Sequence, residues 1–562
     1  MALTPALTAR DLPLRLPRAG LVLAALIPAL PILVVFAALP GSPPELWREL
    51  WQTVLPEYLR NSLILVIGVG AGTLGLGLFS AFLVTRLEFP GRRLLAGMFL
   101  LPLALPAYIL AYTYTGLLAP EGAMQGWLRE LTGASGALWP DIRSLPGAIL
   151  IFSLGFYPYV YLLAREALLA PLQGYEDAAR TLGSQRSRLF WKVRLPLIRP
   201  ALFAGVMLAL METMADYGAV YHFGVPTFTT GILRTWHGLG DAQGAMALAA
   251  VLAALTMALF AFELRARGRA RFSHGSHARP VRPRRLSRRQ AMATWIAGLL
   301  IITLGFGAPV LQLGLWALPR IEQVLAPDFQ HLLLHSLLLA LGASGLITAF
   351  ALALALWVRR RPSPVNHAAH RLAGLGYAVP GMVIALGLMI PLGQFDRWLN
   401  AQGIISGLLF SGGLLALLWA YLSRFLALGQ QGVESGFAML RPSYGESART
   451  LGLGPWRTSL AVYLPLLRGS LATVLILAFV ETLKELPATL VLRPFNFNTL
   501  AVRAHELASD ERLADAALPA LCIVLLSLPA VILLARLNGH SGTRDAHPFA
   551  AGGRDANKGV SP

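Results

Sequence analysis

The pentapeptide ARTLG occurs twice in this chain, at residues 179–183 and again at residues 448–452. Both copies belong to a longer internal match with a constant offset of 269 residues, in which LPL at 195–197 pairs with LPL at 464–466. The match keeps its register over about 75 residues, which is long enough to indicate a structural repeat. The chain is therefore expected to contain two related halves in the same orientation.

Apolar runs surround both copies of the pentapeptide. Of the 562 residues, 56% are hydrophobic and only 13% are charged, whereas soluble domains usually carry about 25% charged residues. About 20 apolar residues cross a bilayer. The sequence therefore predicts an all-α polytopic membrane protein with about twelve transmembrane helices in two six-helix parallel pseudo-repeats, and it excludes a large soluble enzyme. The twelve runs lie at 20–39, 62–85, 94–118, 144–169, 200–220, 243–264, 291–318, 335–358, 371–392, 405–428, 469–489 and 513–535.

The basic residues set the predicted orientation. With a cytoplasmic N-terminus, 36 of the 47 Lys and Arg residues fall on the cytoplasmic side and 10 in outer loops, as the positive-inside rule requires. We therefore expect a multi-pass protein of a bacterial inner membrane with both termini in the cytoplasm. A cleaved signal peptide is the alternative for the first run, but the matching run of the second half cannot be removed.

The repeat and the spans together predict the domain organisation. The net charge of +19 is densest in the Arg-rich linker, which we interpret as a contact with anionic lipid headgroups and not with nucleic acid. Each half contains one cytoplasmic loop that carries the repeated pentapeptide, at about 170–200 and about 440–469. The predicted segments are a first half at 1–264, the cytoplasmic linker at 265–290, a second half at 291–536 and a disordered cytoplasmic tail at 537–562.

Each of these loops is built around ARTLG. An acidic residue and small residues open a short helix, where negative charge suits the helix dipole, and a glycine permits a left-handed turn that ends it. A second short helix is expected to follow and to stop near the Leu-Pro pair. An ordinary amphipathic connector is the alternative, but two copies in register favour a shared function. The residues concerned are Asp177, Ala178, Ala179, Arg180, Gly183, Glu446, Ala448, Arg449 and Gly452.

This pattern, acidic-Ala-Ala-x3-Gly-x9-hydrophobic-x-Leu-Pro, resembles the EAA loop of ABC importer permeases, with Ser447 replacing the first alanine in the second copy. The resemblance implies a type I importer permease that works by alternating access and is not an enzyme. It implies that both loops dock on a homodimeric ABC ATPase subunit in the cytoplasm, which binds ATP and Mg²⁺, while this chain binds no cofactor. No lysine follows a glycine, so the sequence lacks a GxxxxGK[ST] phosphate loop.

Charged side chains interrupt two of the apolar runs: Glu212 and Asp216 in the fifth, and Glu481, Lys484 and Glu485 in the eleventh. The carboxylates of each pair are spaced i, i+4, so each pair should lie on one helix face. We expect the two pairs to face each other in the outer half of the membrane. Ionisable residues in a membrane usually face a cavity, and carboxylate oxygens suit hard cations.

We interpret these five residues as a substrate pathway, in which the four acidic side chains are transient metal ligands. Interhelical polar contacts, with the lysine neutralising a glutamate, are the alternative. Two stretches, 216–231 and 484–495, resemble corresponding parts of fused ferric-iron ABC permeases. This resemblance implies that a periplasmic substrate-binding protein delivers Fe(III). Thiamine, polyamine and phosphonate permeases share the architecture and stay open, although an anion fits the carboxylates poorly.

Two repeat-related pairs in the outer loops, Arg234 with Arg503 and Asp241 with Asp510, are candidates for docking the binding protein. Solvated loop charge is the alternative, and both aspartates stand where they can cap the following helix. Two other protein classes compete with this interpretation. An ion-gradient-driven secondary transporter has no need of twin ATPase-docking loops, and a membrane-embedded metalloenzyme would need a motif such as HExxH, which the sequence lacks.

Overall fold

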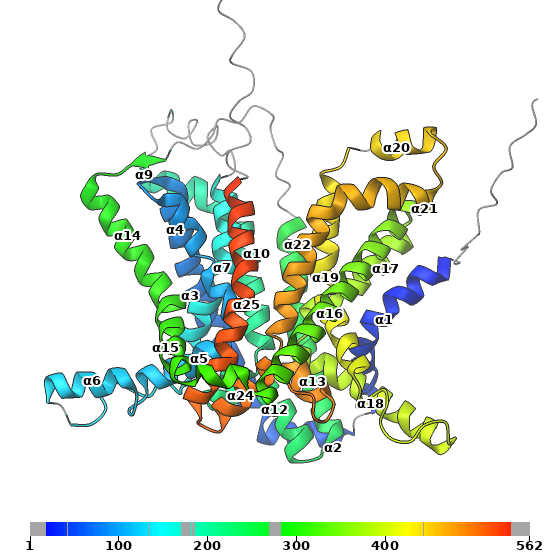
Figure 1. The fold of residues 1–562 in the computed structure, drawn as a ribbon, viewed down its shortest axis with the longest axis horizontal. Helices are drawn as coiled ribbons and strands as arrows, with labels where there is room; N and C mark the ends of the chain where they lie inside the picture. Colours follow the sequence, from blue (N-terminus) through cyan, green and yellow to red (C-terminus); the bar gives the residue numbers. More distant parts are fainter. Residues whose placement is uncertain are drawn as a thin grey trace, which may run out of the picture. The chain divides into compact units, whose positions relative to one another are not determined.

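The computed structural model describes residues 18–41, 43–133, 135–169, 181, 186–268, 283–441 and 443–540. This part of the chain is almost entirely helical (Figure 1), which confirms the predicted all-α class. Its two strands, β1 (Leu87–Glu88) and β2 (Arg284–Arg285), pair in parallel. The longer helices are α1 (Arg18–Ala37), α3 (Leu55–Arg86), α7 (Leu145–Leu169), α10 (Leu195–Ala215), α13 (Ala242–Gly268), α16 (Pro327–Arg360), α18 (Gly381–Ala401), α19 (Leu414–Ala438), α22 (Leu464–Leu483) and α25 (Leu513–His540).

Shorter helices connect these long ones or extend them. A 3-10 turn, η2 (Leu101–Ala104), precedes α5, and π turns, η3 (Phe190–Arg194) and η8 (Ser459–Tyr463), precede α10 and α22. The shorter α-helices are α2 (Pro44–Thr53), α4 (Arg92–Met98), α5 (Ala107–Leu118), α6 (Ala123–Thr132), α9 (Arg186–Leu189), α11 (Gly218–His222), α12 (Phe228–Leu233), α14 (Arg288–Ile302), α15 (Ala308–Ala317), α17 (Pro364–Ala373), α20 (Ser443–Thr450), α21 (Pro455–Thr458), α23 (Pro487–Leu492) and α24 (Leu500–Ser509).

Ten helical segments of the described chain are long and apolar enough to cross a membrane. An eleventh results when the bent pair Arg92–Ala104 and Ala107–Leu118 is counted as one span. These eleven overlap eleven of the twelve predicted runs. The remaining run, 405–428, corresponds to α19, a helix of 25 residues. Arg424, Gln430 and Gln431 interrupt its apolar sequence, so it is not among the ten.

The described residues form two compact units that differ from the sequence halves. Each unit takes its first apolar helix from the opposite half, because α1 joins the second half and α14 with α15 joins the first. The predicted halves therefore describe the sequence repeat and not the packing of the helices. One unit comprises Met1–Gly41, Leu338–Thr482 and Val491–Phe495, and the other comprises Ser42–Leu337, Leu483–Leu490 and Asn496–Pro562.

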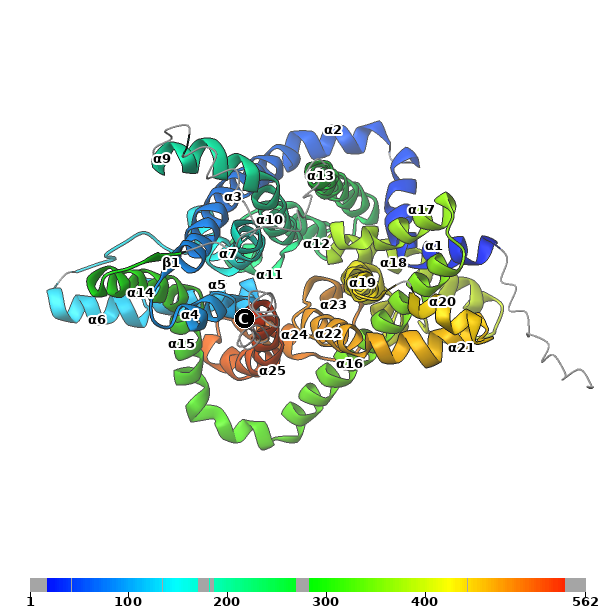
Figure 2. The same cartoon turned by 90° about the horizontal axis from the view of Figure 1, so that it is seen from above.

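Proline explains how α1 joins its unit, where it packs against α17, α18 and α19 (Figure 2). Pro31 lies inside α1 and lacks the amide hydrogen that would bond to the carbonyl of Ile27. The indole nitrogen of Trp419 on α19 donates to this freed carbonyl oxygen at 2.7 Å. A neighbouring helix thus satisfies the backbone group that proline releases, as is required inside a membrane.

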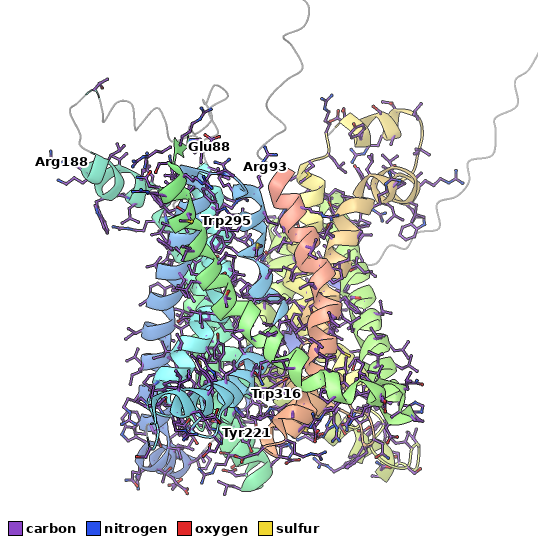
Figure 3. All side chains as sticks on the ribbon, turned by 60° about the vertical axis from the view of Figure 1, so that its left-hand side comes forward. Glu88, Arg93, Arg188, Tyr221, Trp295 and Trp316 are labelled. Carbon is purple, nitrogen blue, oxygen red and sulfur yellow. The ribbon has the colours of Figure 1, made fainter. Side chains whose placement is uncertain are left out.

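In the other unit, α14 is fixed to the turn between α3 and α4. The Trp295 indole nitrogen donates to the Pro90 carbonyl at 2.9 Å, and its ring packs edge-on against Phe89 with centroids 6.3 Å apart. Within this unit, Glu88 and Arg93 lie near one end of the helices, whereas Tyr221 lies near the other end (Figure 3). The first end carries β1 and β2, so the described end of the Arg-rich linker lies at this end.

Candidate functional site

The second copy of the repeated loop forms α20 and a left-handed turn. Gly452 has a φ of +77°. Its amide donates to the Arg449 carbonyl at 3.0 Å, and the Leu453 amide donates to the Ala448 carbonyl at 3.0 Å. This pair of bonds is a Schellman motif, which favours glycine at the left-handed position. The turn expected at this glycine is therefore present.

The outward surface of α20 is charged at its centre and apolar at its end. Glu446 and Arg449 are exposed, as is Leu451, whose side chain is 80% exposed. Ala448 is buried within the chain itself, at 3% exposure. Another protein therefore cannot contact this alanine directly, because its methyl group packs inward.

Packed side chains connect α20 to the ends of two long helices. A Cβ on Gly445 would lie 2.2 Å from the Tyr463 hydroxyl, so α20 sits directly on this tyrosine. The Tyr463 ring meets Phe437 of α19 edge-on, with centroids 5.5 Å apart. The Arg359 guanidinium, at the end of α16, lies 4.1 Å from the Phe437 ring centroid. A displacement of α20 would therefore reach α19 and α16 through direct contacts.

The helix after this loop does not stop at its Leu-Pro pair, contrary to expectation. α21, the π turn η8 and α22 form one continuous helical segment from Pro455 to Leu483. Pro465 falls in the first turn of α22, directly after η8. The wider spacing of a π turn moves the preceding carbonyls away from the proline ring, so the helix continues. In the first half, η3 precedes Pro196 in the same way.

The first copy of the loop falls largely outside the described residues, which resume at Arg186 after the single residue Thr181. Its contact with an ATPase therefore stays a prediction that rests on the sequence match with the second copy. The predicted loop residues that lie outside the described part of the chain are Asp177, Ala178, Ala179, Arg180 and Gly183.

The acidic residues of the fifth and eleventh runs do not lie in pairs along one helix face. α10 ends directly before Asp216, whose backbone is extended, and α22 ends before Glu485. Each helix break therefore separates the two carboxylates of a pair, leaving Glu212 on α10 and Glu481 on α22. The i, i+4 rule holds only while a helix continues, and the residue spacing alone did not show the breaks.

Asp216 and Glu485 cap the short helices that follow these breaks. The Asp216 Oδ1 accepts the amides of the residues three and four positions further on, at 2.9 and 3.4 Å. Glu485 accepts the equivalent amides at 3.1 and 3.2 Å, and also the Thr489 hydroxyl at 3.0 Å. The two caps are separated by the repeat offset, so the second break reproduces the first. Both carboxylates therefore have a local structural role.

The two caps differ from each other in exposure. Glu485 is only 5% exposed, whereas Asp216 is half-buried, as are Glu212, Glu481 and Lys484. Among the described residues, no three His, Cys, Asp or Glu side chains are grouped so that they could hold a metal ion. A metal contact at the four acidic residues is therefore a proposal about transient passage and not about a resident metal.

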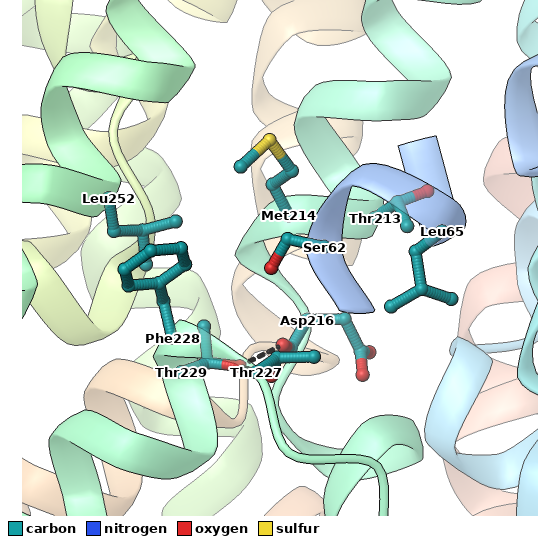
Figure 4. A pocket seen from close by; sticks show the side chains of 9 residues that line it. All are labelled: Ser62, Leu65, Thr213, Met214, Asp216, Thr227, Phe228, Thr229 and Leu252. Atoms are coloured by element: carbon teal, nitrogen blue, oxygen red, sulfur yellow. Dashed lines mark hydrogen bonds between the residues drawn. The ribbon is translucent and has the colours of Figure 1, made fainter. Parts of the chain in front are cut away.

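A small pocket with about 260 Å³ of empty volume lies beside Asp216 (Figure 4). Hydroxyl groups of Ser62, Thr227 and Thr229 line it together with the ring of Phe228. The Thr229 hydroxyl donates to the Asp216 carbonyl at 2.7 Å, which fixes the α12 segment to the break. The sequence analysis did not select these hydroxyl residues, because serine and threonine carry no signal of their own in an apolar run.

The four outer-loop residues predicted to dock a binding protein differ in their surroundings. Asp241 is half-buried, and its Oδ1 accepts the amides of Gln243 and Gly244 at 3.0 and 2.9 Å. It therefore caps α13, as the alternative interpretation anticipated. Arg234, Arg503 and Asp510 are exposed. Their surface position is compatible with docking, which stays a prediction.

The sequence analysis missed a junction at which three helix breaks meet. η2 and α5 form a bend of 92°, and Tyr108 lies in the first turn after it. A Cβ on Gly218, just after the α10 break, would lie 2.6 Å from the Tyr108 Cβ and 2.8 Å from the Leu486 Cδ2. Leu486 belongs to the break after α22. The sequence signals two of these breaks through prolines, Pro106 before α5 and Pro487 at the start of α23.

Comparison with known proteins adds a family model and several relatives. The model described as "Binding-protein-dependent transport system inner membrane component" matches residues 73–270 and again residues 345–544. Two matches of similar length confirm the repeat predicted from the sequence. The chain is also 27% identical over 490 residues to the Fe(3+)-transport system permease protein FbpB 2 of Haemophilus influenzae, which covers 86% of this chain and 90% of that protein.

Two further relatives match only part of the chain. The molybdenum transport system permease protein ModB of Escherichia coli is 31% identical over 211 residues, which cover 37% of this chain and 88% of that protein. The sulfate transport system permease protein CysT of Escherichia coli is 29% identical over 178 residues, which cover 31% of this chain and 62% of that protein. The substrates printed in the names of these three relatives are thus Fe(3+), molybdenum and sulfate.

Proposed function

The chain belongs to the family of inner membrane components of binding-protein-dependent transport systems, with two family domains in one polypeptide, and we propose that its substrate is Fe(III). It is a multi-pass permease subunit and not an enzyme, and its family implies a substrate-binding protein and an ATPase as partners. The ferric permease relative aligns with most of both chains, whereas the molybdate and sulfate relatives align with about a third of this chain.

The observation that carries this proposal is the pattern of acidic residues at the two helix breaks. Asp216 and Glu485 stand at repeat-related positions, with Glu212 and Glu481 one turn earlier. Carboxylates at these positions repel an oxyanion and attract a hard cation. Transport of thiamine or a polyamine, both cations, fits the same residues and is the second candidate.

Coupling to ATP hydrolysis is proposed to run through α20 and its counterpart in the first half. Glu446 and Arg449 are the exposed charged residues that would meet the ATPase, which is expected to be a homodimer that binds ATP and Mg²⁺. With α20 on the cytoplasmic side, we expect both termini of the chain to lie in the cytoplasm. The ATPase must favour one arrangement of the permease by about 5.5 kcal/mol to turn a 1:99 population into 99:1.

Substrate identity is tested by uptake into cells that lack the chromosomal gene and express this chain from a plasmid. Labelled Fe(III), thiamine, a polyamine, molybdate and sulfate are supplied in parallel, and the empty plasmid is the control. We expect plasmid-dependent uptake of Fe(III) alone. Uptake of an oxyanion without Fe(III) would overturn the proposed substrate class, and uptake of thiamine or the polyamine alone would select the second candidate.

The pathway role of the remaining carboxylates gives a further prediction. The double variant Glu212→Gln with Glu481→Gln keeps side-chain size but removes two negative charges, so Fe(III) uptake should fall at least fivefold. Both residues are half-buried on helices, and a Gln at each position preserves helix propensity. Protein level in the membrane and thermal stability should stay unchanged. Wild-type uptake in this variant would show that the two glutamates only support helix packing.

A further inference from the structure

The junction of three helix breaks contains a buried hydroxyl group that the described residues leave without a partner. Tyr108 is 4% exposed, and its phenolic oxygen has no hydrogen-bond partner among the described residues. An unpaired buried polar group costs about 1–3 kcal/mol. Its position therefore needs a reason that packing alone does not supply.

The surroundings of this hydroxyl are unusual for a residue packed among apolar helices. At Gly218, the first residue of α11, the side chains of Tyr108 and Leu486 lie so close that a Cβ would clash with both. Non-helical backbone at membrane depth is tolerated where it is buried in protein or lines a pathway. At Gly218, three helix breaks lie together, so three non-helical segments of the backbone are close to one another.

The junction also carries negative charge. Asp216 stands two residues before Gly218, and Glu485 stands directly before Leu486, so both carboxylates belong to segments that pack against Tyr108 at this junction. Tyr217, the residue after Asp216, is buried as well, and its ring packs against His505 with centroids 5.5 Å apart. The junction is thus polar, enclosed by aromatic rings and acidic.

We propose that the Tyr108 hydroxyl contacts the hydrated ferric ion as it passes the junction of the three helix breaks. The phenol oxygen accepts a hydrogen bond from a water ligand that the ion carries, or the phenol donates to a hydroxide ligand, while the two carboxylates supply compensating charge. This contact rests on the proposed iron transport. It adds a phenolic hydroxyl to a pathway that the sequence predicts from four carboxylates and Lys484.

A matched pair of tyrosine variants tests the contact. Tyr157 has an equally buried hydroxyl with no partner among the described residues, but it lies in a hydrophobic cluster with Phe99 and Tyr161. Tyr108→Phe and Tyr157→Phe each remove one unpaired hydroxyl and keep the ring. Thermal stability should therefore not fall in either variant, because no hydrogen bond is lost.

Uptake separates the two positions. The maximal rate of Fe(III) uptake should fall about tenfold in Tyr108→Phe and stay unchanged in Tyr157→Phe, while ATPase activity stimulated by loaded binding protein is retained in both. Wild-type uptake in Tyr108→Phe, equal losses in both variants, or a lower thermal stability of Tyr108→Phe would each overturn the proposed contact.

The same variants keep this test separate from the substrate assignment. If the wild-type chain imports thiamine or a polyamine and no Fe(III), the iron assignment fails. Uptake of the imported cation is then measured in both tyrosine variants. A tenfold loss confined to Tyr108→Phe would then support the hydroxyl contact with a different cation. A loss confined to molybdate or sulfate uptake would contradict a cation contact at this junction.

Discussion

Gly452→Pro should abolish uptake by this permease while leaving it folded in the membrane. Gly452 holds a φ of +77°, which the proline ring cannot adopt, and its amide donates to the Arg449 carbonyl. Proline therefore breaks the Schellman motif at the end of α20, at a local cost of about 3 kcal/mol. We expect substrate uptake to fall more than tenfold, measured in cells with matched protein levels.

Two control variants distinguish this effect from general damage. Gly133 ends α6 with a φ of +67° and an amide that donates to the Arg129 carbonyl at 2.8 Å, so Gly133→Pro breaks the same kind of turn elsewhere. It should retain most of the uptake. Gly452→Asn should also be active, because asparagine tolerates the left-handed conformation. Full activity of Gly452→Pro would remove the loop from the coupling mechanism.

Glu485→Ala should destabilise the permease more than any other single change among the membrane carboxylates. The side chain is 5% exposed and accepts the amides of Ala488 and Thr489 and the Thr489 hydroxyl. Alanine leaves the two buried amides unpaired, at a total cost of about 2–5 kcal/mol, while the Thr489 hydroxyl still donates to the Glu485 backbone carbonyl at 2.8 Å. Thermal unfolding in detergent should therefore shift to a clearly lower temperature.

Glu485→Gln and Glu446→Ala are the matched comparisons for this variant. Glutamine retains one acceptor oxygen, so its loss of stability should be intermediate. Glu446 is exposed on α20, and its removal should leave the unfolding temperature unchanged. If Glu485→Ala unfolds like the wild-type protein, then the cap contributes little to stability, and the Glu485 charge would have to act on the substrate alone.

The helical class and the positions of the spans were predictable because each depends on local composition. Runs of about 20 apolar residues and the distribution of arginine need no knowledge of tertiary contacts. The left-handed turn at Gly452 was predictable for the same reason, since a glycine after a short helix is a local signal. The packing of α1 against helices of the second half was not predictable, because it depends on a tertiary contact in which Trp419 donates to the carbonyl that Pro31 frees.

In the candidate pathway, the residues were predictable but their arrangement was not. The acidic residues are conspicuous in apolar runs, whereas i, i+4 spacing places two side chains on one face only where the helix is continuous. The breaks before Asp216 and Glu485 are stabilised by hydrogen bonds from each side chain to the backbone that follows. Tyr108 had no signal beyond Pro106 nearby, since only the packing at Gly218 brings the three breaks together.

The source of energy for uptake tests the central claim most directly. Cells expressing the chain with its ATPase and binding protein are depleted of ATP while an imposed proton gradient is maintained, and Fe(III) uptake is followed over time. The account predicts that uptake stops when ATP is depleted and resumes when ATP is restored. Uptake that continues on the gradient alone would contradict it and would identify a secondary transporter.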